Sequence, residues 1–487
     1  MKNKISIFIL CLFSAFFLSS CEDFLGGDTN IDPTRTNDAS LNTLLPTVIF
    51  YTGQSAQSNA YVASQYVQQL GSVSAGGTDA LFRNEFASQW VNLYLNVIPN
   101  CNIIIKKAQA SNSPYYSGVA KILLAYNLGI ATTTWENIPY KEADNNLTNF
   151  SPKYDSQESI YAAALNLLNE GIGELGQAAS LFSPATDDLV YKGDKTKWIK
   201  LANTLRARYL LHLLKKQGTG NLAQIKEALS KGLSSNADDF QLIYTERNFN
   251  PWHSVALANN TGNLSVTFGG QWINYLNGTQ YSDMVDPRLP LMAFKTGTNP
   301  QYIGVVAGKG STGSNTVFND RTAFYGWFCR VDAPVQMATY SEAKFIEAET
   351  QFLTGGGTRT SVGTSADVQA AFAEGIRANM QKIGVSAANI TTYLNGISKT
   401  ADKLTLSDIM VEKYKSLFVN PEVWVDVRRY DSDPTIYKNL TFPETPNVDV
   451  KGAWITRGVY PTSETSRNSE VTKANFKDLN QKMWIFQ

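Results

Sequence analysis

The sequence is poor in the residues that build metal centres. Its 487 residues include only two histidines, His212 and His253, and four cysteines. Neither an H-E-x-x-H motif nor a cysteine cluster occurs, so we expect no metal site and predict that His212 is a satisfied structural residue. The G-x-S-x-G motif of hydrolytic serines is also missing. We therefore expect a protein that works without metal or cofactor.

An excess of charge of one sign is missing as well. Lys and Arg number 42, and Asp and Glu also number 42. Nucleic acid is excluded as a partner, because it would require an excess of basic residues on one face. Beyond its start, the chain has no apolar run of the roughly 20 residues that span a bilayer. Aromatic residues are plentiful instead, with 23 Tyr, 24 Phe and 9 Trp, most of which we expect in the core.

The start of the chain has the pattern of an export signal. Two lysines precede an apolar run, Ile5 to Phe17, which at about 13 residues is too short to span a membrane. The following LSSC, which ends at Cys21, resembles the lipobox of bacterial lipoproteins, where the chain is cut before an acylated cysteine. This resemblance implies a signal peptide over residues 1–20, a lipid anchor on Cys21 and a lipidated tether over residues 21–40.

Two cysteines remain in the chain beyond the anchor, Cys101 and Cys329. They could pair in an oxidising compartment. We expect two buried free thiols instead, because two cysteines do not make a disulfide framework.

Helical periodicity dominates residues 41–235 and 339–419. Apolar residues recur there at three- and four-residue spacing, and helix starts such as Ser113-Pro114 are present. The predicted helices cover residues 41–70, 88–110, 114–135, 155–180, 195–216, 221–234, 339–354, 366–384 and 405–419. Successive helices of this length suggest a tetratricopeptide-like stack, although no clean 34-residue repeat is present. The predicted fold class is therefore mainly α, with tetratricopeptide-like helix pairs.

Residues 236–335 and 420–487 break the helical rhythm. They are rich in Gly, Asn, Thr, Pro and aromatic residues, so we expect an irregular, loop-rich part with short strands. GKGSTG, at Gly308 to Gly313, matches a dinucleotide-binding pattern, but no helix follows it, and we predict a surface loop. Long irregular stretches in a compact protein usually carry function. We expect one domain over residues 41–487, with the ligand site in these irregular regions.

Short motifs in a fixed order resemble the signature of the SusD/RagB family. The most informative is EKYKSLFVNPEVWVDVRR, at residues 412–429, in which Asp426 is placed to pair with an arginine. The others are WENIPYKEA (135–143), KWIKLANTLRARYLLHL (197–213), DPRL (286–289), SEAKFIEAE (341–349), ITRGVYPTSETSRN (455–468) and the terminal KMWIF. DTNIDPTRTNDAS (28–40) and QYVQQLGSVSAGG (65–77) are most similar to the subgroup called SusD-like 2.

The resemblance implies a surface-exposed, lipid-anchored outer-membrane protein of Bacteroidetes. Such a protein captures oligosaccharide and delivers it, as a hinged lid, to a SusC-like TonB-dependent transporter, without catalysis of its own. Two alternatives stay open: a peptide-binding lid of the same kind of transporter, and a surface glycoside hydrolase. A hydrolase needs two carboxylates that face each other across the substrate, and the sequence alone does not show such a pair.

The resemblance also implies where a ligand binds. Family sites gather residues from the loop before an early Trp-bearing helix and from the irregular central region. The residues expected from these two regions are Asp79, Phe82, Arg83, Asn84, Trp252, Trp272, Tyr275, Tyr281 and Trp327. Sugar rings stack on aromatic faces, while Asn, Asp and Arg side chains bond the hydroxyls. For each aromatic residue the alternative is core packing, which we expect for Trp90.

Overall fold

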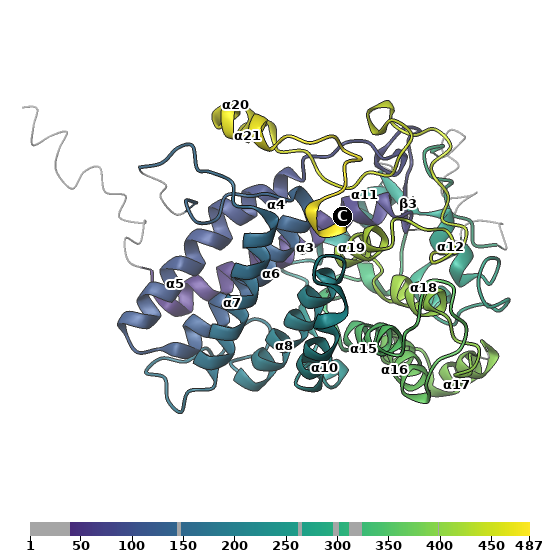
Figure 1. Cartoon of the computed structure of the whole chain (residues 1–487), viewed down its shortest axis with the longest axis horizontal. Helices are drawn as coiled ribbons and strands as arrows, with labels where there is room; N and C mark the ends of the chain where they lie inside the picture. The colour runs from purple at the N-terminus through teal and green to yellow at the C-terminus, as the bar shows by residue number, and fades with distance from the viewer. Residues whose placement is uncertain (1–38, 144–147, 262–264, 296–300, 311–323, 398) are drawn as a thin grey trace, which may run out of the picture.

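The computed structural model describes residues 39–143, 148–261, 265–295, 301–310, 324–397 and 399–487 (Figure 1). Helices predominate within these ranges, which confirms the predicted fold class, and the strands form two short antiparallel pairs. The predicted signal peptide, Cys21 and most of the tether lie outside the described residues. Among the helices that are described, none combines the length and the apolar character needed to cross a membrane.

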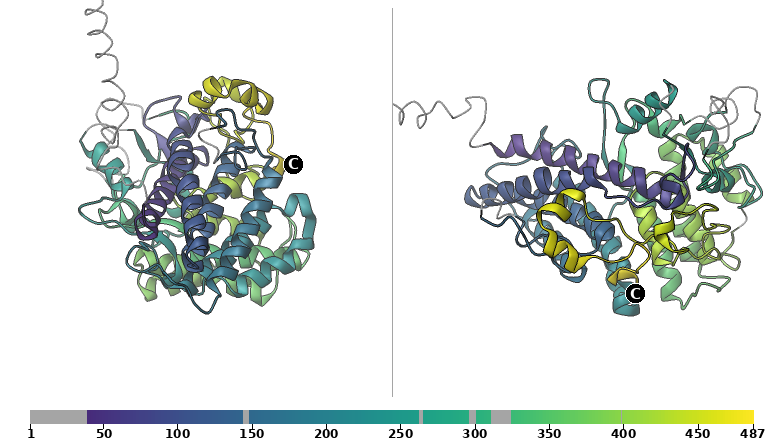
Figure 2. Two further views of the ribbon diagram at one scale, coloured as in Figure 1. Left: turned by 90° about the vertical axis from the view of Figure 1, so that its left-hand side faces the viewer. Right: turned by 90° about the horizontal axis from the view of Figure 1, so that it is seen from above.

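A long helix, α3 (Leu41–Tyr66), begins the described fold and runs through its centre. It packs against α5 (Ile98–Ala110), α6 (Pro114–Trp135) and α19 (Glu422–Arg429), so it joins the two ends of the chain. In the view of Figure 1, α3 runs behind the helices of the N-terminal half toward the loop-rich part, as the view from above in Figure 2 also shows.

The remaining helices of the stack follow one another in space as they do in the sequence. Contacts run from α5 to α6, α7, α8, α10, α15 and α16 in turn. These helices and their short neighbours are α4 (Ala87–Val91), the π-helical turn η3 (Asn92–Val97), α7 (Gln157–Leu175), α8 (Lys195–His212), α9 (Leu214–Gln217), α10 (Leu222–Ser230), α15 (Tyr340–Thr354), α16 (Ala366–Ile383), α17 (Ala387–Gly396) and α18 (Leu406–Ser416). Antiparallel neighbours in this order form the predicted stack of helix pairs.

Capping side chains explain where several of these helices begin. The side chains of Ser156, Asp194 and Thr339 accept hydrogen bonds from backbone amides in the first turns of α7, α8 and α15. Each such cap contributes about 1 kcal/mol to helix stability. Ser113 stands at the N-cap position of α6 without capping it, because its hydroxyl accepts a hydrogen bond from the Phe182 amide at 3.1 Å.

Helix α6 is buried along almost its whole length. Its residues from Tyr116 to Trp135 are all buried, whereas the sequence predicts a single buried stripe. A helix that is enclosed on every side lies inside the protein and not at its surface. The one lysine in this stretch, Lys121, is compensated by Glu174 at 2.6 Å and Glu170 at 2.8 Å.

The loop-rich part contains the two short sheets. Strand β1 (Leu70–Ser72) pairs with β3 (Val266–Phe268), and β2 (Phe240–Leu242) pairs with β4 (Val335–Ala338). Short helices accompany them: α11 (Pro251–Asn260), α12 (Gly270–Leu276) and α13 (Leu289–Met292). The sequence predicts short strands in residues 236–335. Strands β2 and β3 lie within this range, and β4 begins at its last residue.

The C-terminal region contains helices that the sequence does not predict. Residues 420–487 are expected to be irregular, but they begin with the buried helix α19 and later form the short helices α20 (Thr462–Arg467) and α21 (Ser469–Asn475). Helix α19 has eight residues, too few for its period to stand out in the sequence next to Asn420 and Pro421.

The family-like motif of residues 412–429 builds a buried ion cluster, which we define as Glu349, Lys413, Asp426 and Arg429. Arg429 pairs with Glu349 at 2.8 Å and with Asp426 at 2.6 Å, which confirms the predicted pairing of Asp426 with an arginine. Lys413 approaches the other oxygen of Asp426 at 2.8 Å. Burial alone would raise the pKa of Asp426, but Lys413 and Arg429 lower it below its ordinary value.

The residues of DPRL and His212 are structural as well. Arg288 pairs with Asp286 and Glu412, each at 2.6 Å, and all three side chains are buried. His212 is buried between the hydroxyl of Tyr161 at 2.9 Å and Glu422 at 2.5 Å, as a satisfied structural histidine should be. The DPRL motif and the motif at residues 412–429 therefore hold helices together in the core.

Candidate functional site

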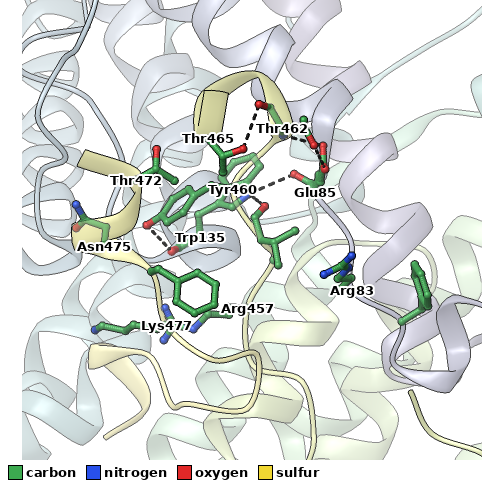
Figure 3. A pocket seen from close by; sticks show the side chains of 14 residues that line it. Arg83, Glu85, Trp135, Arg457, Tyr460, Thr462, Thr465, Thr472, Asn475 and Lys477 are labelled. Carbon is green, nitrogen blue, oxygen red and sulfur yellow. Dashed lines mark hydrogen bonds between the residues drawn. The ribbon is translucent and has the colours of Figure 1, made fainter. Parts of the chain in front are cut away.

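A pocket of about 430 Å³ opens where the loop at residues 82–85 meets the C-terminal segment at residues 457–477 (Figure 3). Pockets of this size class are typical of sites for small ligands. Figure 1 shows α20 and α21 above α4, at the edge of the helix stack. The pocket therefore joins two parts of the chain that are far apart in the sequence.

Trp135, the last residue of α6, fixes the two walls of the pocket. Its buried indole N–H is shared between the carbonyl oxygen of Val459 at 3.0 Å and that of Glu85 at 3.3 Å. Backbone bonds reinforce this junction, because the Val459 amide donates to the carbonyl of Asn84 at 3.0 Å. The pocket thus has a rigid floor that rests on the deeply buried helix α6.

Gly458 makes the close approach of the walls possible. A Cβ atom at this position would lie 2.7 Å from Cδ2 of Phe86, well inside van der Waals contact. Phe86 cannot move away easily, since its buried ring stacks on Trp424 with 5.8 Å between ring centroids. The absence of a side chain at residue 458 is therefore a packing requirement.

Helices α20 and α21 form the outer wall, and polar contacts hold them. The amide and hydroxyl of Thr462 donate to the two carboxylate oxygens of Glu85 at 3.1 Å and 2.5 Å. The Tyr154 hydroxyl donates to Glu464 at 3.0 Å, and the Asn468 side chain donates to the carbonyl of Pro152 at 3.0 Å. Because the two Thr462 bonds are exposed and the other two are only partly buried, this wall is held less firmly than the floor.

Exposed aromatic rings give the pocket its apolar surface. Phe476 is 66% exposed and Phe82 is 47% exposed. Tyr460, which also lines the pocket, is half-buried. Thr465, Thr472 and Asn475 bring hydroxyl and amide groups to the lining of the same pocket, as Figure 3 shows. Flat rings beside hydrogen-bonding groups suit a ligand that has both C–H faces and hydroxyls.

Three cations line the pocket: Arg83, Arg457 and Lys477. Arg457 and Lys477 share one oxygen of the buried Glu136 at 2.7 Å and 2.9 Å, and the Trp484 amide bonds its other oxygen at 2.6 Å. Burial alone would raise the pKa of Glu136, but Arg457, Lys477 and the Trp484 amide together lower it. Glu136 is therefore an anion that holds two of the three cations in place.

The loop residues expected at the site divide into two groups. Phe82 and Arg83 line the pocket. Asp79 is buried, and burial raises its pKa above the ordinary value. Asn84 has a local structural contact, since its side-chain oxygen accepts a hydrogen bond from the Phe86 amide at 2.8 Å. The structure thus brings two of the four residues to the pocket and places the other two in the loop that supports it.

The aromatic residues expected from the central region do not reach this pocket. Trp252, Trp272, Tyr275 and Tyr281 are at most 3% exposed, so none offers a ring face to a ligand in this structure. Trp272, for example, stacks on Phe268 and packs against Phe418. Trp327 is half-buried. The four buried residues therefore pack in the core, which is the alternative considered for them. Trp90 is buried against Trp135, as predicted.

Sequence reasoning missed several residues that the structure places at exposed aromatic surfaces. Tyr460 and Phe476 line the pocket, and only Tyr460 lies within a recognised motif. A separate exposed pair, Phe294 and Tyr325, lies outside the pocket lining with 5.6 Å between ring centroids. Neither the spacing nor the neighbours of these residues in the sequence distinguish them from core aromatics.

Metal-binding groups do not gather anywhere in the described ranges: no set of three or more His, Cys, Asp or Glu side chains could hold an ion there. His253 lies 3.0 Å from the carbonyl oxygen of Cys329. Cys101 and Cys329 are free and buried, as predicted, and burial raises the pKa of both thiols, that of Cys329 to about 12. Such thiols are unreactive, so they serve packing. The residues of GKGSTG that are described, 308 to 310, form part of a loop in which Gly308 and Gly310 have positive φ angles.

Solved structures of SusD-type proteins share this fold. A chitin-binding protein matches with a TM-score of 0.72 at 24% identity, over 90% of this chain and 99% of its own. A SusD homologue from Bacteroides uniformis matches with a TM-score of 0.74 at 18% identity, over 93% and 100% of the two chains. A chitin-binding SusD homologue from Flavobacterium johnsoniae matches with a TM-score of 0.69 at 19% identity, over 92% and 96%. No curated protein matches the chain in sequence.

The sequence itself matches a family model over residues 32–461, which is most of the chain and includes the loop at residues 82–85 and Tyr460 of the pocket. The model is that of SusD-like_2, described as starch-binding and associating with the outer membrane. The chain belongs to this SusD-like_2 family.

Proposed function

We propose that this protein is a cell-surface lipoprotein of the outer membrane that captures oligosaccharide and delivers it to a SusC-like TonB-dependent transporter. Family membership supports binding of glycan and association with the outer membrane. The chitin-binding proteins among its structural relatives support a carbohydrate ligand as well. The lipid anchor on Cys21 rests on the resemblance of LSSC to a lipobox, and the transporter partner rests on the resemblance of the sequence to the SusD/RagB family.

One observation carries the choice of ligand site: the pocket presents open aromatic rings next to hydroxyl and amide groups. Phe476 and Phe82 expose their rings, and Thr465, Thr472 and Asn475 line the same space. Aromatic rings of this kind contribute through the area that they bury and through contact with the C–H face of a sugar. We place the oligosaccharide here, with Phe82 and Arg83 as contacts from the loop and Tyr460 and Phe476 as contacts from the C-terminal wall.

The lining of the pocket supports binding over hydrolysis. Glycoside hydrolysis uses two carboxyl groups roughly 5 to 10 Å apart across the scissile bond. Among the described residues that line the pocket, Glu85 is the one carboxylate, and both its oxygens accept hydrogen bonds from Thr462. A carboxylate held in this way serves the wall of the pocket.

Isothermal titration calorimetry with a panel of oligosaccharides and oligopeptides tests this function. We expect at least one oligosaccharide to bind, and we expect Phe476→Ala to weaken it about tenfold, since one exposed ring contributes roughly 1 to 2 kcal/mol. The matched control is Phe249→Ala, because Phe249 is similarly exposed and lies outside the pocket.

Three other outcomes would redirect the proposal. Binding of peptides but of no glycan would make the protein a peptide-binding lid. Loss of glycan binding in Tyr325→Ala but not in Phe476→Ala would move the site to the exposed Phe294 and Tyr325 pair. Release of reducing ends from a bound glycan would show that the protein is a hydrolase.

Two cellular experiments test delivery. Cys21→Ala should move the protein from the membrane fraction to the soluble fraction without unfolding it, and unchanged fractionation would refute the lipid anchor. Affinity purification of the wild-type protein from solubilised outer membranes should recover a TonB-dependent transporter. Recovery of the protein alone under conditions that preserve membrane complexes would refute the partnership.

A further inference from the structure

The charges around the pocket are unevenly balanced. Three cations and one carboxylate line it, and the carboxylate, Glu85, is bonded by Thr462. Behind the lining, Glu136 compensates Arg457 and Lys477 together with a single negative charge. Arg83 is therefore the one lining cation that neither of these two carboxylates compensates.

Arg83 is the cation most available to a ligand. Its side chain is 62% exposed, and its ion pair among the described residues is a loose one, 3.9 Å from Asp449. Exposed pairs of this kind contribute little to stability, so Asp449 does not hold the guanidinium strongly. The planar guanidinium can present two parallel N–H donors to a carboxylate.

Lys477 offers a second donor on the same side of the pocket. Its ammonium group has three hydrogens, its one ion pair within the described ranges is that with Glu136, and its side chain is 30% exposed. Phe476, the most exposed ring of the pocket, is its neighbour in the sequence. Figure 3 shows Lys477, Arg457 and Arg83 along one side of the pocket, and Thr465 and Thr472 along the other. A sugar ring on Phe476 would have cations at one edge and hydroxyl groups at the other.

From this arrangement we infer that the pocket selects acidic oligosaccharide, with the carboxylate of a uronic acid unit bound by Arg83 or Lys477. This inference rests on the proposed function, because it specifies the class of sugar that the pocket takes. A uronate could replace the loosely paired Asp449 as the partner of Arg83 or share the ammonium group of Lys477, whereas a neutral sugar offers no charge to either cation. A charge-assisted hydrogen bond is also about twice as strong as a neutral one.

Matched pairs of ligands test the inference. Oligosaccharides built from galacturonic, guluronic or glucuronic acid are titrated into the full protein by calorimetry, each alongside its carboxyl-reduced counterpart, which has the same rings and linkages without the charge. We expect the acidic member of at least one pair to bind about tenfold more tightly at low salt, since a hydrogen bond to a charged group has about this strength. Its advantage should shrink as the ionic strength rises.

Two variants locate the effect. Arg83→Gln and Lys477→Gln should each reduce the preference for the acidic member by several fold while they leave the affinity for its reduced counterpart nearly unchanged. Lys473→Gln is the matched control, because Lys473 is exposed on α21, pairs with Glu470 and does not line the pocket. The preference should be the same in this control as in the wild type.

The outcomes separate this inference from the function on which it rests. Equal affinity for both members of every pair, or binding of neutral glycans alone, would overturn the acidic selection and leave glycan capture intact. A preference that survives in both pocket variants would also overturn it. If no oligosaccharide of any kind binds, the proposed function itself fails.

Discussion

Two groups of charged residues in this protein have opposite surroundings. The buried ion cluster of Glu349, Lys413, Asp426 and Arg429 is enclosed, and its two cations face two carboxylates. The pocket is open, and its cations outnumber the carboxylate on its lining. Charges that compensate one another in the core specify the fold, whereas weakly paired charges at an open surface are available to a ligand.

The residues of the buried cluster and some of the residues that would contact a ligand also differ in their relation to the family pattern. The buried cluster comes from the motif at residues 412–429 and from α15, so the residues that carry the family resemblance support the packing of helices. Phe476 and Lys477 lie beyond residue 461, where the match to the family model ends. The features that would distinguish one ligand from another thus lie partly outside the shared pattern.

The largest expected effect is on the buried cluster. Glu349→Ala removes the carboxylate that accepts bonds from Arg429 at 2.8 Å and from the Tyr430 hydroxyl at 2.6 Å. A buried cation that loses its partner costs about 3 to 5 kcal/mol, and the free energy of unfolding in urea should fall by that amount. Glu470→Ala is the matched control, because Glu470 is 86% exposed and pairs with the exposed Lys473, and it should change stability by less than about 0.5 kcal/mol. Similar losses in the two variants would show that enclosure does not distinguish these charges.

Gly458→Ala tests the contact between the pocket and α19, the helix that carries Asp426 and Arg429 of the buried ion cluster. The new Cβ would lie 2.7 Å from the ring of Phe86, which stacks on Trp424 in the same helix as Asp426 and Arg429. Overpacking of this kind costs about 1 to 3 kcal/mol, and ligand binding should weaken as well because the walls of the pocket move apart.

Gly173→Ala serves as the control for that substitution. Gly173 lies in α7, and a Cβ there would meet no atom within 4 Å. Alanine favours a helix by about 0.5 to 1 kcal/mol over glycine, so this variant should gain stability and keep its affinity for glycan. Unchanged stability and binding in Gly458→Ala would show that the pocket is loosely built.

The smallest effect is expected at a partly exposed cluster around Asp431. Burial opposes its ionisation, but Lys482, Arg359 and Lys215 lower the pKa of Asp431 to about 2. Because this folded pKa lies below the unfolded value of about 4, the stabilisation is complete above pH 4 and is lost as the pH falls toward 2. Asp431→Asn should therefore reduce the free energy of unfolding by about 0.2 to 1 kcal/mol at pH 7.

Urea titrations of Asp431→Asn and of the wild type at pH 7, 4 and 2 measure this dependence. The two unfolding curves should converge toward pH 2, because the wild-type carboxyl is then losing its charge. A difference that stays constant from pH 7 to pH 2 would contradict an electrostatic origin.

Much of the fold could be predicted from the sequence because its signals are local. Side chains such as those of Ser156, Asp194 and Thr339 mark the starts of helices, and apolar spacing marks the buried faces. Short elements were harder to predict. Helix α17 (Ala387–Gly396) buries only Ile390 and Tyr393 among its side chains, so its apolar pattern is too sparse to indicate a helix.

The pocket could be predicted only in part, because it depends on contacts between distant segments. Phe82 and Arg83 were expected from the family resemblance, but Phe476 had no pattern to mark it. Trp272 and Tyr275 were expected at the ligand site but are buried, since an aromatic residue in an irregular segment can pack inside as easily as outside. Exposure is decided by tertiary contacts, such as the stacking of Trp272 on Phe268, and these have no period in the sequence.

The bond between the Val459 amide and the Asn84 carbonyl has a consequence for how the protein matures. It closes a loop of more than three hundred residues, and contacts of such long range form late, because the entropy of loop closure must first be overcome. A nascent or clipped polypeptide that ends before Arg457 could assemble its helix stack and still be unable to retain a sugar. Retention on an immobilised glycan would thus act as a quality check, since it selects molecules that are full-length and completely folded.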